Sequence, residues 1–150
     1  MQTGIRVIDA MTKMPITVSA DSTIEECAKR MDRDGVGSLL VMDGSKLAGI
    51  LTERDLTRRV LAKALPPLTT TARDIMTTDI VYVQPDMDIF DAVMRMNDFD
   101  VRHTPVLHNG EFVGFLTHKD ILKIQPDLFD IFVNKFSLRE EDDKPIMGRT

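Results

Sequence analysis

The stretch Gly49-Ile50-Leu51-Thr52-Glu53-Arg54-Asp55 decides the fold, because it recurs 65 residues later as Gly114-Phe115-Leu116-Thr117-His118-Lys119-Asp120. In both copies an apolar, strand-like segment runs into a helical one, with a hydroxyl and then a carboxylate at the junction. A helix N-terminus carries unpaired N–H groups and the positive end of the helix dipole, so it suits an anion such as phosphate. A carboxylate three residues on can accept the hydroxyls of a ribose. The same Thr-x-x-Asp pattern is also a helix capping box, which needs no ligand.

The constant offset of 65 residues extends over most of the chain. Asp9-Ala10-Met11-Thr12 matches Asp74-Ile75-Met76-Thr77, and the match continues without a gap to Asp55 and Asp120. A solenoid usually needs three or more repeats. Two long copies therefore predict a duplicated unit that forms one pseudo-symmetric body.

Each repeat predicts the same succession of elements. A short helical turn, at about residues 5–11 and 72–76, leads to a brief strand at 16–18 or 80–83. An amphipathic helix follows, with apolar residues at positions i, i+3, i+4 and i+7. In the first repeat Ser22-Thr23-Ile24-Glu25 has the pattern of its capping box.

Two further strands follow this helix in each repeat. The turn signals Asp43-Gly44 and Asn109-Gly110 indicate that each pair of strands forms a hairpin. A second helix then begins at Thr52 or Thr117. The predicted order is β-α-β-β-α, twice, which makes the chain an α+β protein.

These patterns divide the chain into five segments. Paired prolines cannot continue a helix, so residues around Pro66-Pro67 form a linker. Apolar residues on one face after Pro126 predict a final helix that must pack on the body or on a second chain. The segments are a first repeat (1–63), a linker (64–71), a second repeat (72–125), a C-terminal amphipathic helix (126–137) and a charged tail (138–150).

Composition excludes several classes of protein. The net charge of −5 argues against broad affinity for nucleic acid or an anionic membrane. No apolar run approaches the ~20 residues that span a bilayer, and the N-terminus lacks the apolar core of a signal peptide. Cys27 is the only cysteine, so no intrachain disulfide is possible and a cytoplasmic location is expected.

The duplicated unit resembles the CBS-domain family (cystathionine-β-synthase-type repeats) of the prokaryotic stand-alone type, over about residues 5–124. The stretches that carry the resemblance are Gly-Ser-Leu-Leu-Val-Met-Asp-Gly-Ser-Lys-Leu-Ala-Gly-Ile-Leu-Thr-Glu-Arg-Asp (37–55) and Val-Arg-His-Thr-Pro-Val-Leu (101–107). The resemblance implies tandem repeats with sheets packed face to face and helices outside. It also implies clefts between the repeats for adenosine-containing ligands, and a homodimer.

The resemblance further implies which residues bind the ligand. Asp55 and Asp120 would hold ribose hydroxyls, while Thr52 and Thr117 would contact phosphate or ribose. The adenine would contact residues of both repeats, namely Thr12, Ile16, Val36 and Gly37 in the cleft of Thr117 and Asp120, and Thr77, Val81, Val101 and Arg102 in the cleft of Thr52 and Asp55. Core packing is an equally good account of the four aliphatic residues Ile16, Val36, Val81 and Val101.

Cations near the clefts could neutralise phosphate. The resemblance places Arg102 and His103 at the mouth of a strand, and Arg54 lies inside the motif; the alternative for each is a solvated surface charge. An Arg side chain suits phosphate because its planar fork donates two hydrogen bonds. Gly37 and Ser38 stand where the second repeat has Arg102 and His103, so we expect the two clefts to differ in the charge of the ligand that they prefer.

These observations predict a non-catalytic regulatory module that binds AMP, ADP or ATP, and alternatively NAD(H) or S-adenosylmethionine, without a covalent cofactor. It would signal to an effector protein or to a fused domain missing from this sequence, with no nucleic acid or membrane partner. A ligand-free dimerisation module is the alternative. An enzyme is least favoured, because the sequence has no nucleophile–base pair, metal cluster or P-loop pattern. The three histidines lack the spacing of a zinc site, so no metal is expected.

Overall fold

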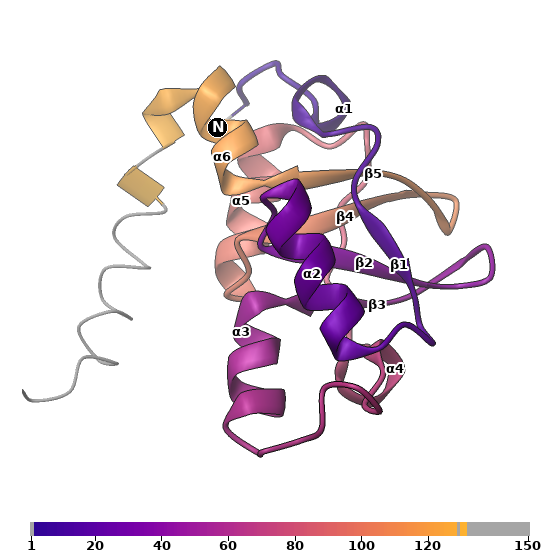
Figure 1. Cartoon of the computed structure of the whole chain (residues 1–150). Helices are drawn as coiled ribbons and strands as arrows, with labels where there is room; N and C mark the ends of the chain where they lie inside the picture. The colour runs from indigo at the N-terminus through magenta and orange to yellow at the C-terminus, as the bar shows by residue number, and fades with distance from the viewer. Residues whose placement is uncertain (1, 129, 132–150) are drawn as a thin grey trace, which may run out of the picture. The chain divides into compact units, whose positions relative to one another are not determined.

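The computed structural model describes residues 2–128 and 130–131, which fold into two compact units (Figure 1). The first-repeat unit consists of Lys13–Ile80 together with Asn109–Phe112. The second-repeat unit consists of the chain up to Thr12, Val81–His108 and the chain from Val113 onward. Each unit therefore contains segments that are far apart in the sequence.

The first-repeat unit carries a three-stranded mixed sheet. Strand β1 pairs in parallel with β2, and β2 pairs antiparallel with β3, so Val18 lies opposite Val41 and Leu40 lies opposite Ile50. The predicted order β-α-β-β-α is confirmed in this unit. Its elements are β1 (Thr17–Ser19), α2 (Ile24–Asp34), β2 (Ser38–Asp43), β3 (Lys46–Thr52), α3 (Glu53–Asp55), the π-helical segment η1 (Leu56–Leu61) and α4 (Ala72–Ile75).

Helix α2 is capped at both ends by its own sequence. The Thr23 hydroxyl accepts a hydrogen bond from Glu26 N at 3.2 Å, and the Glu26 carboxylate accepts one from Thr23 N at 3.1 Å. The capping box thus begins one residue later than the Ser22–Glu25 pattern predicted, because Thr23 is the residue with extended backbone. Gly35 ends the helix in the left-handed conformation that favours glycine, at φ 64°.

The second-repeat unit has no strand before α5 among its described residues, and its sheet consists of two strands, β4 and β5. Its core is formed by apolar faces of the helices and strands, including Val7 of the first helix and Leu128 near the end of the described chain. Its elements are α1 (Val7–Ala10), α5 (Ile89–Asp98), β4 (His103–His108), β5 (Glu111–Thr117), α6 (His118–Ile124) and the 3-10 turn η2 (Pro126–Leu128).

The strand predicted at 80–83 is wrong, because only a single parallel bridge forms there, between Val83 and Val106. In the first repeat Leu40 N donates to Ile16 O at 3.1 Å and extends the ladder. The residue that corresponds to Leu40 is Pro105, which has no N–H group. The hydroxyl of Thr104 donates to Val81 O instead, at 2.5 Å, so the backbone ladder is cut short.

The N-terminal segment packs within the second-repeat unit. Val7 N donates to Met87 O at 2.8 Å, and Ile89 N donates to Ile5 O at 2.9 Å. The buried carboxylate of Asp88 caps α5 through Phe90 N at 2.9 Å and also accepts hydrogen bonds from Thr3 and Gly4. Burial opposes ionisation of Asp88, but these hydrogen bonds outweigh it and lower the pKa of the carboxyl.

Of the predicted C-terminal helix (126–137), the structure describes only the start. Pro126–Leu128 forms a 3-10 turn and Leu128 is buried, while residues 129 and 132–137 and the predicted charged tail (138–150) lie outside the described residues.

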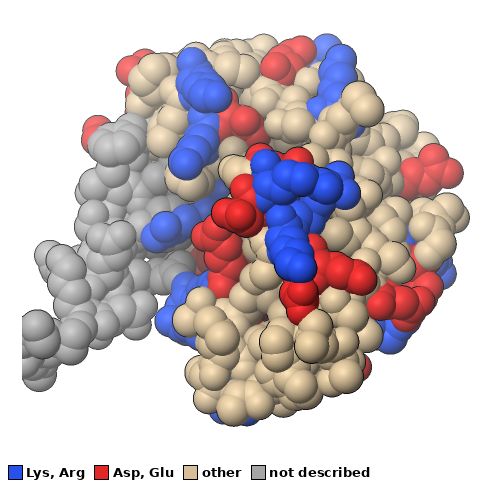
Figure 2. All heavy atoms as spheres, in the orientation of Figure 1, with Lys and Arg blue, Asp and Glu red and all other residues tan. Residues whose placement is uncertain are grey.

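Charges of both signs alternate on the surface. On the face shown in Figure 2, Lys and Arg side chains lie among Asp and Glu side chains. Helix α2 contributes several such pairs, including Lys29 with Glu25 at 2.6 Å and Arg30 with Asp34. Within the described residues, no helix is long and apolar enough to cross a bilayer.

Candidate functional site

Both Thr-x-x-Asp motifs form capping boxes. Thr52 Oγ1 accepts a hydrogen bond from Asp55 N at 3.1 Å, and Asp55 Oδ2 accepts one from Thr52 N at 2.9 Å. The corresponding distances for Thr117 and Asp120 are 3.1 and 3.0 Å. The capping role is therefore confirmed for both pairs. Because each box uses one carboxylate oxygen, Oδ2, the other oxygen of each Asp remains the candidate acceptor for a ligand.

Each box lies next to a threonine that the sequence assigned to the same cleft. Thr77 pairs with Ile50 on β3, two residues before Thr52, and Thr12 pairs with Phe115 on β5, two residues before Thr117. Each unit thus brings a predicted adenine-contacting threonine beside its own capping box. We call each of these groups, Thr52-Asp55-Thr77 and Thr117-Asp120-Thr12, a half-site.

Glycine is required where these threonines meet the strands. A Cβ atom at Gly49 would stand 2.8 Å from Thr77 O and 2.7 Å from Met76 Sδ. A Cβ atom at Gly114 would stand 3.0 Å from Thr12 O and 2.5 Å from Met11 Sδ. The glycine at the start of both motifs therefore admits the segment that carries the threonine.

An arginine that the sequence analysis missed distinguishes the two half-sites. Arg59 Nε lies 3.6 Å from Asp55 Oδ1, and Arg59 Nη1 donates to Ile75 O at 2.9 Å. Arg59 thus connects the Asp55 carboxylate to Ile75 at the end of α4, two residues before Thr77. The matching residue of the second repeat is Ile124, and Asp120 forms no ion pair with any residue that the structure describes. The i,i+4 spacing between Asp55 and Arg59 was a signal that could have revealed this pair.

The entrances to the second strand of each repeat also differ. Glu53 N donates to Gly37 O at 3.0 Å, and the Glu53 carboxyl group lies 3.5 Å from the position of a Cβ at Gly37. In the second repeat His118 N donates to Arg102 O at 2.9 Å, and His118 Nδ1 lies 3.2 Å from the same oxygen. The Thr52-Asp55-Thr77 half-site thus has Glu53 at the position where the other half-site has His118, whose neighbour on the adjoining strand entrance is Arg102.

The remaining predicted residues divide between the units. Ile16 and Val36 are half-buried and pack against the first-repeat core, while Val101 packs against the second-repeat core. His103 is half-buried with its ring stacked on Phe115 at 6.0 Å between centroids. The first-repeat unit holds Ile16, Val36, Gly37, Thr52, Arg54, Asp55 and Thr77, and the second-repeat unit holds Thr12, Val81, Val101, Arg102, His103, Thr117 and Asp120. Each predicted cleft draws residues from both units, so its assembly stays a prediction.

The described residues offer neither a metal-binding cluster nor a reactive thiol. No group of three or more His, Cys, Asp or Glu side chains gathers among them. Cys27 is buried on α2, and burial, helped by the charge of Glu26, raises the pKa of its thiol to about 11. A thiol with this pKa is a poor nucleophile at neutral pH.

A family model described as the CBS domain matches this chain twice, over residues 7–62 and 72–127. The chain belongs to the CBS-domain family. It is 36% identical to the uncharacterised protein MK0525 of Methanopyrus kandleri over 75% of this chain and 59% of that protein. It is 32% identical to the CBS domain-containing protein YhcV of Bacillus subtilis, over 77% of this chain and 81% of YhcV. The chain therefore spans less than two thirds of MK0525.

Solved CBS structures have the same fold. The CBS domain pair of protein MJ0100, solved with 5′-methylthioadenosine and S-adenosyl-L-methionine, superposes with a TM-score of 0.72 at 27% identity, covering 80% of this chain and 94% of that one. Hypoxic Response Protein I, solved with two coordinated zinc ions, superposes with a TM-score of 0.71 at 29% identity, covering 79% and 98%. The prediction of a tandem CBS pair with an α+β fold is thereby confirmed.

Proposed function

We propose that this CBS pair is a non-catalytic sensor that binds an adenosine-containing ligand in clefts between its repeats. The observation that carries the proposal is the twin half-site, in which a capping box holds a partly buried carboxylate beside a threonine on the neighbouring strand. The methylthioadenosine and S-adenosylmethionine bound by the MJ0100 pair support an adenosine-type ligand for this fold.

In the proposed complex, Asp55 Oδ1 and Asp120 Oδ1 accept hydrogen bonds from ribose hydroxyls. Thr52 and Thr117 remain as caps and present the first N–H groups of α3 and α6 to phosphate or ribose. The Arg102 and Arg54 side chains, both exposed, provide positive charge for phosphates. AMP, ADP and ATP are the ligands we favour, with NAD(H) and S-adenosylmethionine as alternatives, and no covalent cofactor takes part.

Binding acts as a signal only if the ligand has different affinities for two states of the protein. We propose that these states differ in the arrangement of the repeats or of a homodimer, and that an effector protein or a fused domain reads the difference in the cytoplasm. The repeat and linker boundaries given above (1–63, 64–71 and 72–125) stay predictions.

A thermal-shift panel with AMP, ADP, ATP, NAD, NADH and S-adenosylmethionine tests the proposal. A ligand at 100 times its dissociation constant adds about 2.7 kcal/mol to folding stability, which raises the melting temperature of a protein of this size by roughly 5–10 °C. The Asp55→Asn/Asp120→Asn double variant keeps an oxygen for each capping box but removes the charge that attracts ribose hydroxyls. We expect it to fold and to lose the ligand-induced rise.

Three results would contradict this function. A flat panel at millimolar ligand concentration favours a ligand-free dimerisation module. A rise that survives in the double variant places the ligand elsewhere. Turnover of the bound nucleotide, followed by chromatography of the mixture, shows an enzyme.

A further inference from the structure

A methionine stands directly before the threonine of each half-site, and its sulfur lies on the glycine of the facing strand. In the first-repeat unit, a Cβ atom at Gly49 would stand 2.7 Å from Met76 Sδ and 2.8 Å from Met76 Cγ. In the second-repeat unit, a Cβ atom at Gly114 would stand 2.5 Å from Met11 Sδ and 3.1 Å from Met11 Cε. Each unit therefore has a thioether seated where the strand offers no side chain.

The same segments have little other backbone pairing to the strands. Thr77 and Ile50 exchange hydrogen bonds of 2.9 and 3.0 Å, and Thr12 and Phe115 exchange hydrogen bonds of 2.8 and 2.9 Å. Both pairs are isolated bridges that no neighbouring ladder supports among the described residues. The thioether contact is thus next to the bonds that hold each threonine, and a change at the sulfur acts on them.

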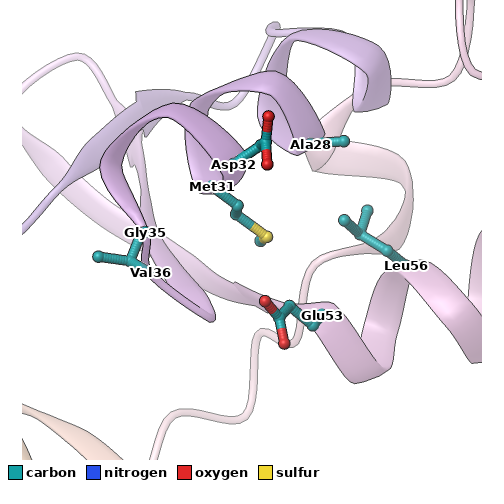
Figure 3. A pocket seen from close by; sticks show the side chains of 7 residues that line it. All are labelled: Ala28, Met31, Asp32, Gly35, Val36, Glu53 and Leu56. Carbon is teal, nitrogen blue, oxygen red and sulfur yellow. The ribbon is translucent and has the colours of Figure 1, made fainter.

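These two methionines lie between the core and the solvent. Met11 and Met76 are both half-buried, and each packs against the core cluster of its own unit. Met14, by contrast, is 88% exposed. Met31 on α2 is only 4% exposed and faces the same pocket as Leu56 (Figure 3). The chain therefore contains an exposed and a buried methionine with which the two can be compared.

A thioether at such a position is open to oxidation by hydrogen peroxide. The sulfur lone pair attacks one peroxide oxygen, the O–O bond breaks, and the proton of the transferred oxygen leaves with the released hydroxide as water. The sulfur is oxidised by two electrons and the peroxide is reduced. The product, methionine sulfoxide, is larger and polar, so it no longer suits an apolar contact with a strand backbone and a core cluster.

We propose that Met11 and Met76 are reversible oxidation sites, and that peroxide releases the threonine segments of both half-sites through them. Each sulfoxide leaves its glycine, the adjoining bridge opens, and the threonine moves from its place beside the capping box. Methionine sulfoxide reductases restore the thioether and with it the half-site. This modification needs no nucleotide, so it holds whether or not the proposed ligand binds.

The first measurement is the rate of oxidation at each methionine of the folded full chain in hydrogen peroxide. Trypsin cleaves after Lys13, so Met11 and Met14 fall in different peptides, and tandem mass spectrometry locates each added oxygen. We expect Met14 to react first, Met11 and Met76 next, and Met31 last. Oxidation of Met11 and Met76 only as slowly as Met31 would show that peroxide does not reach them, and would overturn the proposal.

The second measurement is amide hydrogen exchange, followed by NMR before and after oxidation. We expect exchange at the Thr12 and Thr77 N–H groups to become roughly tenfold faster in the oxidised protein, and its melting temperature to fall by roughly 2–10 °C. Treatment with reductases for both sulfoxide epimers should reverse both changes. Unchanged exchange in a protein oxidised at Met11 and Met76 would overturn the proposal without the use of any variant.

Variants then assign the effect to these two sulfurs. Met11→Leu/Met76→Leu keeps an apolar side chain of similar volume and cannot be oxidised there, so peroxide should leave its exchange rates unchanged. Met14→Leu is the matched control and should respond to peroxide as the wild type does. If the Met11→Leu/Met76→Leu variant lost protection in peroxide to the same extent as the wild type, other methionines would be responsible and the proposal would be wrong.

Discussion

Thr12 and Phe115 exchange two backbone hydrogen bonds, of 2.8 and 2.9 Å, from nearly opposite ends of the chain. Ile50 and Thr77 form the same pair in the first-repeat unit, at 2.9 and 3.0 Å. Each half-site therefore depends on a short segment that carries its threonine. This segment pairs through one β-bridge with the strand, β3 or β5, that ends at the capping box. The position of the threonine is set by the backbone, so residues with no contact to a ligand can control the site.

Substituting Gly114 or Gly49 with Ala should displace these segments. The new methyl group would lie 2.5 Å from Met11 Sδ or 2.7 Å from Met76 Sδ, and close to a backbone oxygen in both cases. Overpacking of this kind costs about 1–3 kcal/mol, which denaturant unfolding can measure. Gly37→Ala is the control, because its Cβ would meet only the Glu53 side chain at 3.5 Å. Equal stability of all three variants would contradict the close approach.

Thr52→Ala and Thr117→Ala should each destabilise the protein by about 0.5–2 kcal/mol, because the Asp N–H group of each box loses its acceptor. The measurement is chemical unfolding of each variant. The matching Ser variants keep a hydroxyl and should lie within a few tenths of a kcal/mol of the wild type. A Ser variant as unstable as its Ala counterpart would mean that the threonine methyl group, and not the cap, matters.

Stability should fall in acid partly through Asp88. Its pKa is lowered in the folded protein, so its stabilisation is present above the ordinary carboxyl pKa of 3.8 and is lost as the pH falls through the lower folded value. Asp88→Asn keeps an N-cap acceptor for Phe90 N but does not titrate. We expect the stability difference between wild type and Asp88→Asn to shrink as the pH is lowered from 7 to 3 in urea titrations. If this stability difference stayed constant over the pH range, the charge of Asp88 would not contribute to stability.

The rate at which a thiol reagent modifies Cys27 should report how often the protein unfolds. Its thiol is buried and its pKa is raised to about 11, so at pH 8 a thiol reagent should react only as fast as the protein opens, and at once in denaturant. The raised pKa also means that stability contributed by the neutral thiol is present below pH 9.0 and is lost as the pH rises toward 11. Rapid reaction in the native state would contradict this burial.

Arg59 should weaken ribose binding at the first-repeat half-site, because it forms an ion pair with Asp55 Oδ1, the oxygen that the capping box does not use. This prediction rests on the proposed function. Arg59→Ile introduces the residue found at the matching second-repeat position and should strengthen the weaker of two binding steps about 1.5- to 5-fold, as expected for loss of a partly exposed ion pair. Calorimetric titration with AMP measures both steps. Two identical steps in the wild type would contradict the non-equivalence.

The elements and the two capping boxes could be predicted from sequence because their signals are local. The Thr-x-x-Asp motif, the turn residues and the helix periodicity all act within a few residues. The missing strand before β4 could not be predicted this way, because it depends on Pro105 facing Val81 across the sheet. The run Ile80-Val81-Tyr82-Val83, taken alone, predicts a strand.

The candidate site was predictable only in part, for a related reason. Asp55 and Asp120 follow from the motif, whereas the role of Arg59 depends on the end of α4, which lies 16 residues further along the chain.

The interleaving of the segments has a consequence for biosynthesis. Thr12 is translated before Phe115, with which it pairs, by on the order of 5–20 s at ordinary translation rates. Most of the first-repeat unit, including Thr77, is complete in the meantime. Ile5 and Val7 must therefore stay exposed or be shielded by a chaperone while the chain grows, and they are buried only after most of the first-repeat unit has been made.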